Sequence, residues 1–246
     1  MGYHESLTEG RNAVLEAFRS GKTVDRLFVL DGCQDGPVKT ILREAKKQDT
    51  MVQYVKKERL DQLSETKNHQ GVIAYCAACE YAEVSDILEN AKKKGEAPFI
   101  VLLDGIEDPH NLGAIIRTAN QAGAHGVIIP KRRAVGLTAT VARTSAGAVN
   151  YTPVAKVTNL VTVMEDLKKE GMWFVCADMD GEEMYSLNLK GPIGLVIGNE
   201  GEGVSRRVKE HCDMVASIPM KGDIDSLNAS VAMGVLAYEI VRQRRF

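Results

Sequence analysis

Two polar loops near the C-terminal end carry the side chains best suited to chemistry. The first, Gly198–Gly203, reads GNEGEG and follows the apolar run Leu195–Ile197. The second, Pro219–Asn228, reads PMKGDIDSLN and follows the apolar run Met214–Ile218. Each run is short and bounded by turn residues, which is typical of a buried strand. Because ligands of open α/β sheets bind beyond the carboxyl ends of the strands, these loops predict a binding site.

The first loop is rich in glycine, which lets a backbone approach a ligand closely. Its spacing matches neither a dinucleotide fingerprint nor a P-loop. Glu200 would also repel a phosphate, so we do not expect a phosphate cradle. Two interpretations stay open: a ligand-binding loop, or an ordinary strand-to-helix turn in which Glu200 and Glu202 favour a helix N-terminus.

The second loop leads into a long predicted helix over residues 227–242. Ser226 is a good N-cap for this helix, and Asn228 and Ser230 then lie in its first turn. A cap needs one polar residue, whereas three stand here at alternate positions. The surplus indicates polar atoms directed at a ligand.

A third polar cluster follows the apolar run Phe99–Leu103. The sequence DPHN at 108–111 predicts a helix with an aspartate cap and a proline at its first position, so that Asn111 lies in the first turn. Arg117 follows in an apolar sequence context. It either extends from a core face or is paired in a site or interface, and the sequence leaves both open.

Apolar strands and helical segments alternate from residue 97 to the end. This order predicts a mostly parallel sheet with helices on both faces, because fully buried strands read as continuous apolar runs. Besides the runs already named, the expected strands are Gly126–Ile129, Val149–Val154 and Trp173–Ala177.

The first 80 residues form a smaller predicted α/β/α domain. Helices are expected over 9–19, 38–47 and 57–63, and strands over 24–30, 51–55 and 71–78. Residues 81–96 are charge-rich and are interpreted as a linker that contains a helix over 84–95. His69 precedes the last strand and is interpreted as an exposed loop histidine.

Composition limits the class of protein. The chain has 246 residues and a formal net charge of −2, so it gives no global basic signal for nucleic acid. RNA would have to be held by local patches, for which 131–133 (KRR) and 242–245 (RQRR) are the candidates, although such runs are usually solvated surface.

Nothing in the sequence predicts a membrane protein or a disulfide framework. No stretch approaches the roughly 18 apolar residues of a membrane span, and the N-terminus lacks the apolar core of a signal peptide. The five cysteines are scattered and odd in number, which favours a reducing cytoplasm. Cys76 and Cys79 form a lone CxxC with no second ligand pair, so no metal is expected.

Three segments together resemble the motifs of the SpoU (TrmH) family of RNA ribose 2′-O-methyltransferases. They are DPHNLGAIIRTANQAGAHGVII at 108–129, GLVIGNEGEGVS at 194–205 and IPMKGDIDSLNASVAMGVLAYE at 218–239, in the family's order and spacing. Residues 1–80 resemble the small substrate-binding domain, of the ribosomal-protein-L30e type, that precedes the catalytic domain in RlmB-like members. Those members methylate the 2′-oxygen of a guanosine in 23S rRNA.

The resemblance implies a SPOUT fold for 97–246, an α/β domain with a deep trefoil knot, and an S-adenosylmethionine cofactor bound in the knot. It also implies a cytoplasmic homodimer joined through this domain, with RNA rather than DNA as the partner and with 1–80 as the RNA-binding domain. The cofactor residues it implies are Ile197, Gly198, Ile218, Met220 and Leu227.

The catalytic residues that the resemblance implies are Asn111, Arg117, Glu200, Ser226 and Asn228. The family casts Arg117 as the proton acceptor. A guanidinium has a pKa above about 12 and stays protonated, so we favour a role as an electrostatic clamp on phosphate and developing alkoxide. Glu200 would then orient Arg117 or accept the proton. A tRNA methyltransferase of the same fold and a non-catalytic RNA-binding protein are the alternatives.

Overall fold

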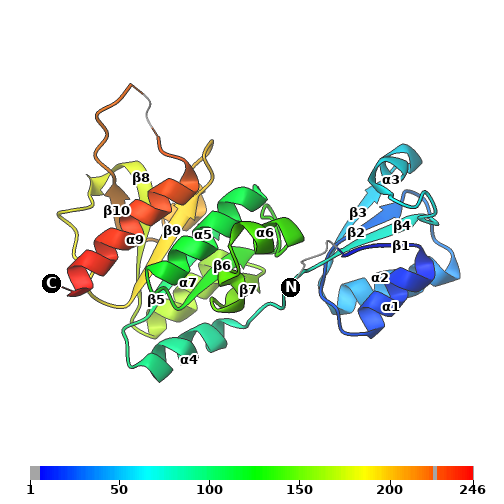
Figure 1. Ribbon diagram of the computed structural model, residues 1–246, viewed down its shortest axis with the longest axis horizontal. Coiled ribbons are helices and arrows are strands. Elements are labelled where there is room, and N and C mark those ends of the chain that lie inside the picture. The colour runs from blue at the N-terminus through cyan, green and yellow to red at the C-terminus, as the bar shows by residue number, and fades with distance from the viewer. Residues whose placement is uncertain (1–5, 224–225, 246) are drawn as a thin grey trace. The chain divides into compact units, whose positions relative to one another are not determined.

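The chain folds into two compact units (Figure 1). The computed structural model describes residues 6–223 and 226–245. One unit comprises Met1–Glu80 with Gly136–Thr140, and the other comprises Tyr81–Val135 with Val141–Phe246. No helix in the described part of the chain is long and apolar enough to cross a membrane.

The first unit is a three-layer α/β/α structure, as predicted. Within its described residues, the sheet has the order β1-β4-β2-β3, in which β2 and β3 are parallel and β4 is antiparallel to β1 and β2. Helices α1 and α2 pack on one face through residues such as Phe18 and Ile41, and α3 packs on the other through Leu60. The elements are β1 (Ser6–Glu9), α1 (Arg11–Arg19), β2 (Val24–Leu30), α2 (Gly36–Lys47), β3 (Met51–Val55), α3 (Lys57–Leu63) and β4 (Val72–Cys76).

His69 is buried, so its interpretation as an exposed loop histidine is wrong. Its Nδ1 accepts the Gly71 N–H at 3.0 Å, and its Nε2 lies 3.0 Å from Asp61 Oδ1. Because Nδ1 is an acceptor, the proton resides on Nε2 and is donated to Asp61. The ring therefore joins α3 to the turn before β4.

The second unit contains the predicted parallel sheet. In the described residues its strand order is β10-β8-β9-β5-β6-β7, and every neighbouring pair is parallel. The central strands β9 and β5 are buried along their length, apart from the last residue of β5. The strands are β5 (Phe99–Asp104), β6 (Gly126–Pro130), β7 (Val154–Val157), β8 (Trp173–Glu183), β9 (Ile193–Gly198) and β10 (Met214–Ser217).

Helices cover both faces of this sheet (Figure 1). One face packs against α4 (Val84–Lys94), α7 (Leu160–Lys169) and α8 (Arg206–Lys209), through a core that includes Met164 and Val208. The other face carries α5 (Pro109–Gln121) and α9 (Ala229–Arg245), which pack against each other. Two short elements complete the chain, α6 (Ala139–Thr144) and the 3₁₀ turn η1 (Ala148–Asn150).

Two expectations need comment. The strand expected over Val149–Val154 is wrong, because 148–150 form η1 and β7 begins only at Val154. Residues 81–96, interpreted as a linker, contain α4, and Ile87 of this helix is fully buried in the core of the second unit. A Cβ built on Gly126 of β6 would lie 2.5 Å from Ile87, so helix and sheet are in direct contact.

Candidate active site

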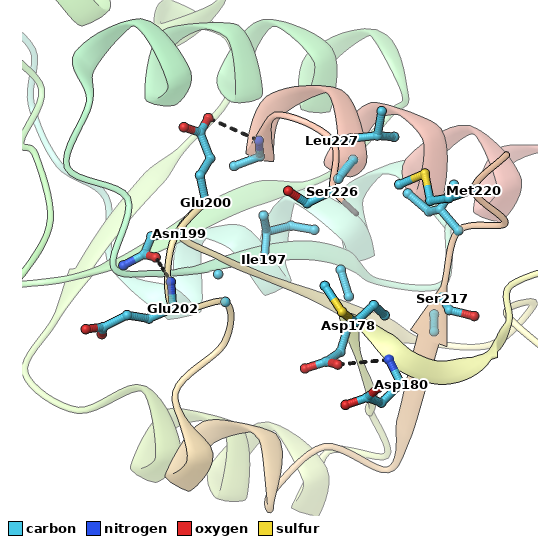
Figure 2. A pocket seen from close by; sticks show the side chains of 18 of the residues that line it. Asp178, Asp180, Ile197, Asn199, Glu200, Glu202, Ser217, Met220, Ser226 and Leu227 are labelled. Carbon is cyan, nitrogen blue, oxygen red and sulfur yellow. Dashed lines mark hydrogen bonds between the residues drawn. The ribbon is translucent and has the colours of Figure 1, made fainter. Parts of the chain in front are cut away.

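A cavity of about 810 Å³ lies at the carboxyl ends of β8, β9 and β10. Both polar loops singled out in the sequence line it, together with the start of α9. Figure 2 shows Ile197 between the segment before α9, with Ser226 and Leu227, and the opposite wall, with Asp178 and Asp180. Residues 224–225 of the second loop lie outside the described residues.

The glycine-rich loop folds back on itself. The Asn199 Oδ1 accepts the backbone N–H groups of Gly201 at 2.9 Å and Glu202 at 2.6 Å. A Cβ on Gly198 would lie 2.0 Å from the Gly203 carbonyl carbon, so only glycine fits at the end of β9. The loop's shape is thus fixed by Asn199 and Gly198, and the role of Asn199 was not predicted from the sequence.

Glu200 brings the three polar segments together. The Asn111 Nδ2 donates to Glu200 Oε1 at 2.9 Å, and the Asn228 Nδ2 donates to the same oxygen and to Asn111 Oδ1, the latter at 2.9 Å. The Ala229 N–H, at the first residue of α9, lies 3.4 Å from Glu200 Oε1. The positive end of a helix favours a carboxylate there. The structure therefore groups three of the predicted catalytic residues.

Asn228, rather than Ser226, caps α9. Its Oδ1 accepts the Ser230 N–H at 3.0 Å and the Ser230 hydroxyl at 2.6 Å. The expectation that Ser226 is the N-cap is wrong, because α9 begins at Ala229 and not at Leu227. Ser226 instead lines the cavity with an exposed side chain. Its hydroxyl is thereby left for a ligand.

Arg117 lies apart from this group. Its side chain is exposed on α5, whereas Ile115 and Ile116 are fully buried. The arginine therefore reaches solvent from α5. Arg117 is not among the residues that line the cavity, and the described part of the chain gives its guanidinium no hydrogen bond or ion pair. Glu200 consequently does not orient Arg117 within one chain.

The residues expected to bind a cofactor all line the cavity. They are Ile197, Gly198, Ile218, Met220 and Leu227. Ile197 is buried, Leu227 is half-buried and Met220 is 41% exposed, so an apolar wall runs from the sheet to the solvent. Apolar walls with nearby backbone groups suit a planar base and an aliphatic chain. The cavity therefore fits an adenosine-containing cofactor.

The end of β8 forms a wall that the sequence analysis missed. Asp178 and Asp180 line the cavity, and Lys209 of α8 forms an ion pair with Asp178 at 2.7 Å. Burial alone would raise the pKa of Asp178, but hydrogen bonds from Lys209 and from the Asp180 N–H lower it below its ordinary value. The acid-rich sequence DMDGEE after an apolar run was the available signal.

The C-terminal basic run is largely structural. Arg242 forms a two-pronged bond with Glu239, with both distances 2.8 Å. Arg244 donates to the carbonyl groups of Ala97, Pro98 and Gly191 at 2.7 to 3.0 Å. Arg244 therefore holds the starts of β5 and β9 against the end of α9, whereas the bond between Arg242 and Glu239 lies within α9. Both arginines are poor candidates for binding RNA.

Comparison with known proteins identifies the class of enzyme. The family model "SpoU rRNA Methylase family" matches residues 98–238, and "RNA 2'-O ribose methyltransferase substrate binding" matches residues 7–82. The chain belongs to the SpoU family of S-adenosylmethionine-dependent RNA 2′-O-ribose methyltransferases.

Individual relatives cover nearly the whole chain. YacO of Bacillus subtilis (strain 168), named for the TrmH family of tRNA/rRNA methyltransferases, is 48% identical over 96% of this chain and 94% of its own length. The SpoU methyltransferase AviRb from Streptomyces viridochromogenes, solved with AdoMet, is 27% identical with a TM-score of 0.62, covering 98% of this chain and 91% of AviRb. The A. aeolicus TrmH/SpoU tRNA modifying enzyme is 28% identical with a TM-score of 0.56, covering 65% and 84%.

Proposed function

We propose that this methyltransferase modifies the ribose 2′-OH of a guanosine in 23S rRNA. The observation that carries the proposal is the joining of Asn111, Glu200 and Asn228 beside a cavity that fits the cofactor. A tRNA guanosine is the competing substrate, and the name of the YacO relative covers both kinds of RNA. A purely RNA-binding role is disfavoured because such a protein would need neither the cavity nor the hydrogen-bonded side chains beside it.

The cofactor site is assigned to the apolar wall and the glycine loop. When bound, S-adenosylmethionine supplies a methyl group on a positively charged sulfur. Ile197, Ile218 and Leu227 would hold the adenosine, with Gly198 and Met220 adjoining. Their task is to fix the position of the donor, since alignment of the reacting atoms supplies much of the rate in a displacement reaction.

We assign the ribose of the RNA to the cluster of polar side chains just before α9. Ser226 and Asn228 would bind sugar hydroxyls, and Asn111 would position Asn228 through their 2.9 Å bond. The bonds to Glu200 converge on Oε1, and the described residues place none on Oε2. That oxygen is thus available to accept the proton that the 2′-OH loses as it attacks the methyl group.

We assign Arg117 to binding RNA at the cavity of a second copy of the chain. No lysine or arginine lines the cavity within the described residues, although the attacking oxygen develops negative charge. A cation from beyond the cavity lining would stabilise that charge, and Arg117 is exposed. The exposed Val231 and Tyr238 on α9 support a homodimer through this unit, which could bring Arg117 to the partner's cavity as an electrostatic clamp.

Several broader assignments belong to the same proposal. The first unit, residues 1–80, would recognise the RNA, and 97–246 would carry the methyltransferase site. The segment from β9 to α9 would thread into the trefoil knot of SPOUT proteins, and the homodimer would act in the cytoplasm. Family membership supports each of these assignments.

Transfer of labelled methyl groups to defined RNAs tests the choice of substrate. The purified protein is incubated with tritiated S-adenosylmethionine and either 23S rRNA transcripts or a tRNA mixture, each made without modifications. We expect label in 23S rRNA at least about tenfold above tRNA, which corresponds to roughly 1.4 kcal/mol of discrimination. Preferential labelling of tRNA would select the alternative, and an RNA complex without label on either RNA would favour a binding protein.

A further inference from the structure

The strand β8 leaves the sheet beside the cavity. Val215 of β10 pairs with Cys176, but the next residue, Ala216, pairs with Glu182. β8 also pairs with β9 only as far as Cys176. Residues 177–181 therefore form a bulge between two paired stretches of one strand. Bulges beside a site commonly redirect side chains toward it.

Two contacts hold the bulge in place. A Cβ on Gly181 would lie 2.5 Å from the Val215 carbonyl oxygen, so the bulge rests directly on the backbone of β10. The ion pair between Asp178 and Lys209 ties the bulge to α8, and the Asp180 N–H donates to Asp178 Oδ1 at 3.1 Å. The bulge is a built wall of the cavity rather than a free loop.

The bulge carries more negative charge than its one ion pair, between Asp178 and Lys209, can balance. Asp180 and Glu183 line the cavity and are exposed, and neither carboxylate has a partner among the residues that the structure describes. Glu200 and Glu202 line the opposite side, and the described lining includes no lysine or arginine. The apolar wall and the family membership, rather than these carboxylates, indicate that the ligand of this cavity is S-adenosylmethionine.

We propose that Asp180 and Glu183 are specificity residues that favour the positively charged methyl donor over the product of its reaction. The inference rests on the proposed cofactor site. S-adenosylmethionine and S-adenosylhomocysteine share the adenosine, amino and carboxylate groups. They differ by one methyl group and by the positive charge on sulfur, which only the donor carries. Negative groups around the cavity attract that charge and give nothing to the neutral thioether.

Calorimetry with both ligands on the full-length protein tests this inference. The variants are Asp180→Asn and Glu183→Gln, which keep size and remove charge. Asp166→Asn is the control, because Asp166 is an exposed acid on α7 outside the cavity. Each cavity variant should weaken S-adenosylmethionine by about two- to fivefold, the range of an exposed charge pair. It should leave S-adenosylhomocysteine within about 1.5-fold, and the control should change neither.

The ratio of the two dissociation constants is the decisive quantity. Equal weakening of both ligands would overturn the inference, because the carboxylates would then contact a group that both ligands share. Unchanged binding of both would also overturn it, while leaving the cofactor site intact. Failure of the unaltered protein to bind either ligand would instead contradict the proposed function. Added salt should weaken only the donor, since screening acts on its extra charge.

Discussion

Asn111 at the start of α5 and Asn228 before α9 are joined by a direct hydrogen bond, although 117 positions separate them in the chain. The bond from Asn228 Nδ2 to Asn111 Oδ1 is 2.9 Å long, and both amides also donate to Glu200 Oε1. Three loops that leave different strands are thus fixed relative to one another by three side chains. The reaction would depend on this arrangement because the ribose must be placed within a narrow range of positions.

Removal of the shared acceptor should impair turnover more than cofactor binding. Glu200→Ala leaves the amides of Asn111 and Asn228 without their common partner, and we expect kcat to fall by about a hundredfold, the scale of a small misplacement. The dissociation constant of S-adenosylmethionine should change less than about threefold. Glu202→Ala is the matched control, since it removes a carboxylate from the same loop without disturbing that group. Equal losses in the two variants would contradict a positioning role.

Arg117 should matter for the chemical step and not for cofactor binding. Arg117→Ala should lose about a hundredfold or more in activity, the scale of one lost electrostatic stabiliser, and Arg117→Lys should retain part of it. Because the side chain is exposed, neither variant should lower the melting temperature. A large loss of cofactor affinity would show that the arginine has another role.

Gly198 should be essential for a structural reason. Its Cβ position is filled by the backbone of Gly203, so even Gly198→Ala should distort the loop and weaken S-adenosylmethionine by at least about tenfold. Gly201→Ala is the matched control, because the nearest atom to its Cβ position is the Asn199 Oδ1 at 3.7 Å. Calorimetry on both variants measures the affinity for S-adenosylmethionine. Equal affinities would show that the shape of the loop at Gly198 does not determine cofactor binding.

A stable catalytic fragment should begin before α4. The Ala82 N–H donates to the Val154 carbonyl group at 2.9 Å, and Ile87 is buried against β6. A fragment over 81–246 should bind cofactor but lose most activity on RNA. A fragment over 96–246 should in addition lose stability, by about 1.5–3 kcal/mol for Ile87 alone. Urea denaturation of the two fragments measures this difference in stability. Equal midpoints would show that α4 is only a linker.

His125 should make the second unit sensitive to acid. It is fully buried, its Nδ1 accepts the Phe99 N–H at 3.0 Å, and burial lowers its pKa below the ordinary value of 6.5 despite the nearby Glu96. The unfolded chain therefore binds the proton more readily. This contribution to stability is fully present above pH 6.5 and is lost as the pH falls from that value toward the lowered pKa.

The pH dependence of urea unfolding tests this expectation. The unfolding free energy should fall as the pH is lowered below about 6.5, and the slope should be smaller in His125→Gln. His110→Gln is the control, because His110 is exposed and its change should leave the slope intact. Identical slopes in all three proteins would contradict the role of His125.

The strands and polar loops of the site could be predicted from sequence because each depends on local pattern. Continuous apolar runs predicted β5 and β9. Asp108 caps α5 and Pro109 is its first residue, as expected. The cap of α9 was misplaced by two residues because Ser226 and Asn228 are both good caps, and only the folded loop decides between them.

Tertiary relationships could not be predicted in this way. The direction of Arg117 depends on which side of α5 faces the sheet, and the sequence around it left two interpretations open. The bulge at 177–181 depends on the register between β8 and β10, which local sequence does not determine. Ile87 looked like part of a linker because α4 is rich in charged residues and buries only a narrow stripe.

The identity of the methylated nucleoside tests whether this protein forms 2′-O-methylguanosine in 23S rRNA. Unmodified 23S rRNA is incubated with the protein and S-adenosylmethionine, digested to nucleosides and analysed by mass spectrometry, with Glu200→Ala in parallel. We expect one new product, 2′-O-methylguanosine, that is greatly reduced in the variant. A methyl group on a base, on another ribose, or formed equally by Glu200→Ala would contradict it.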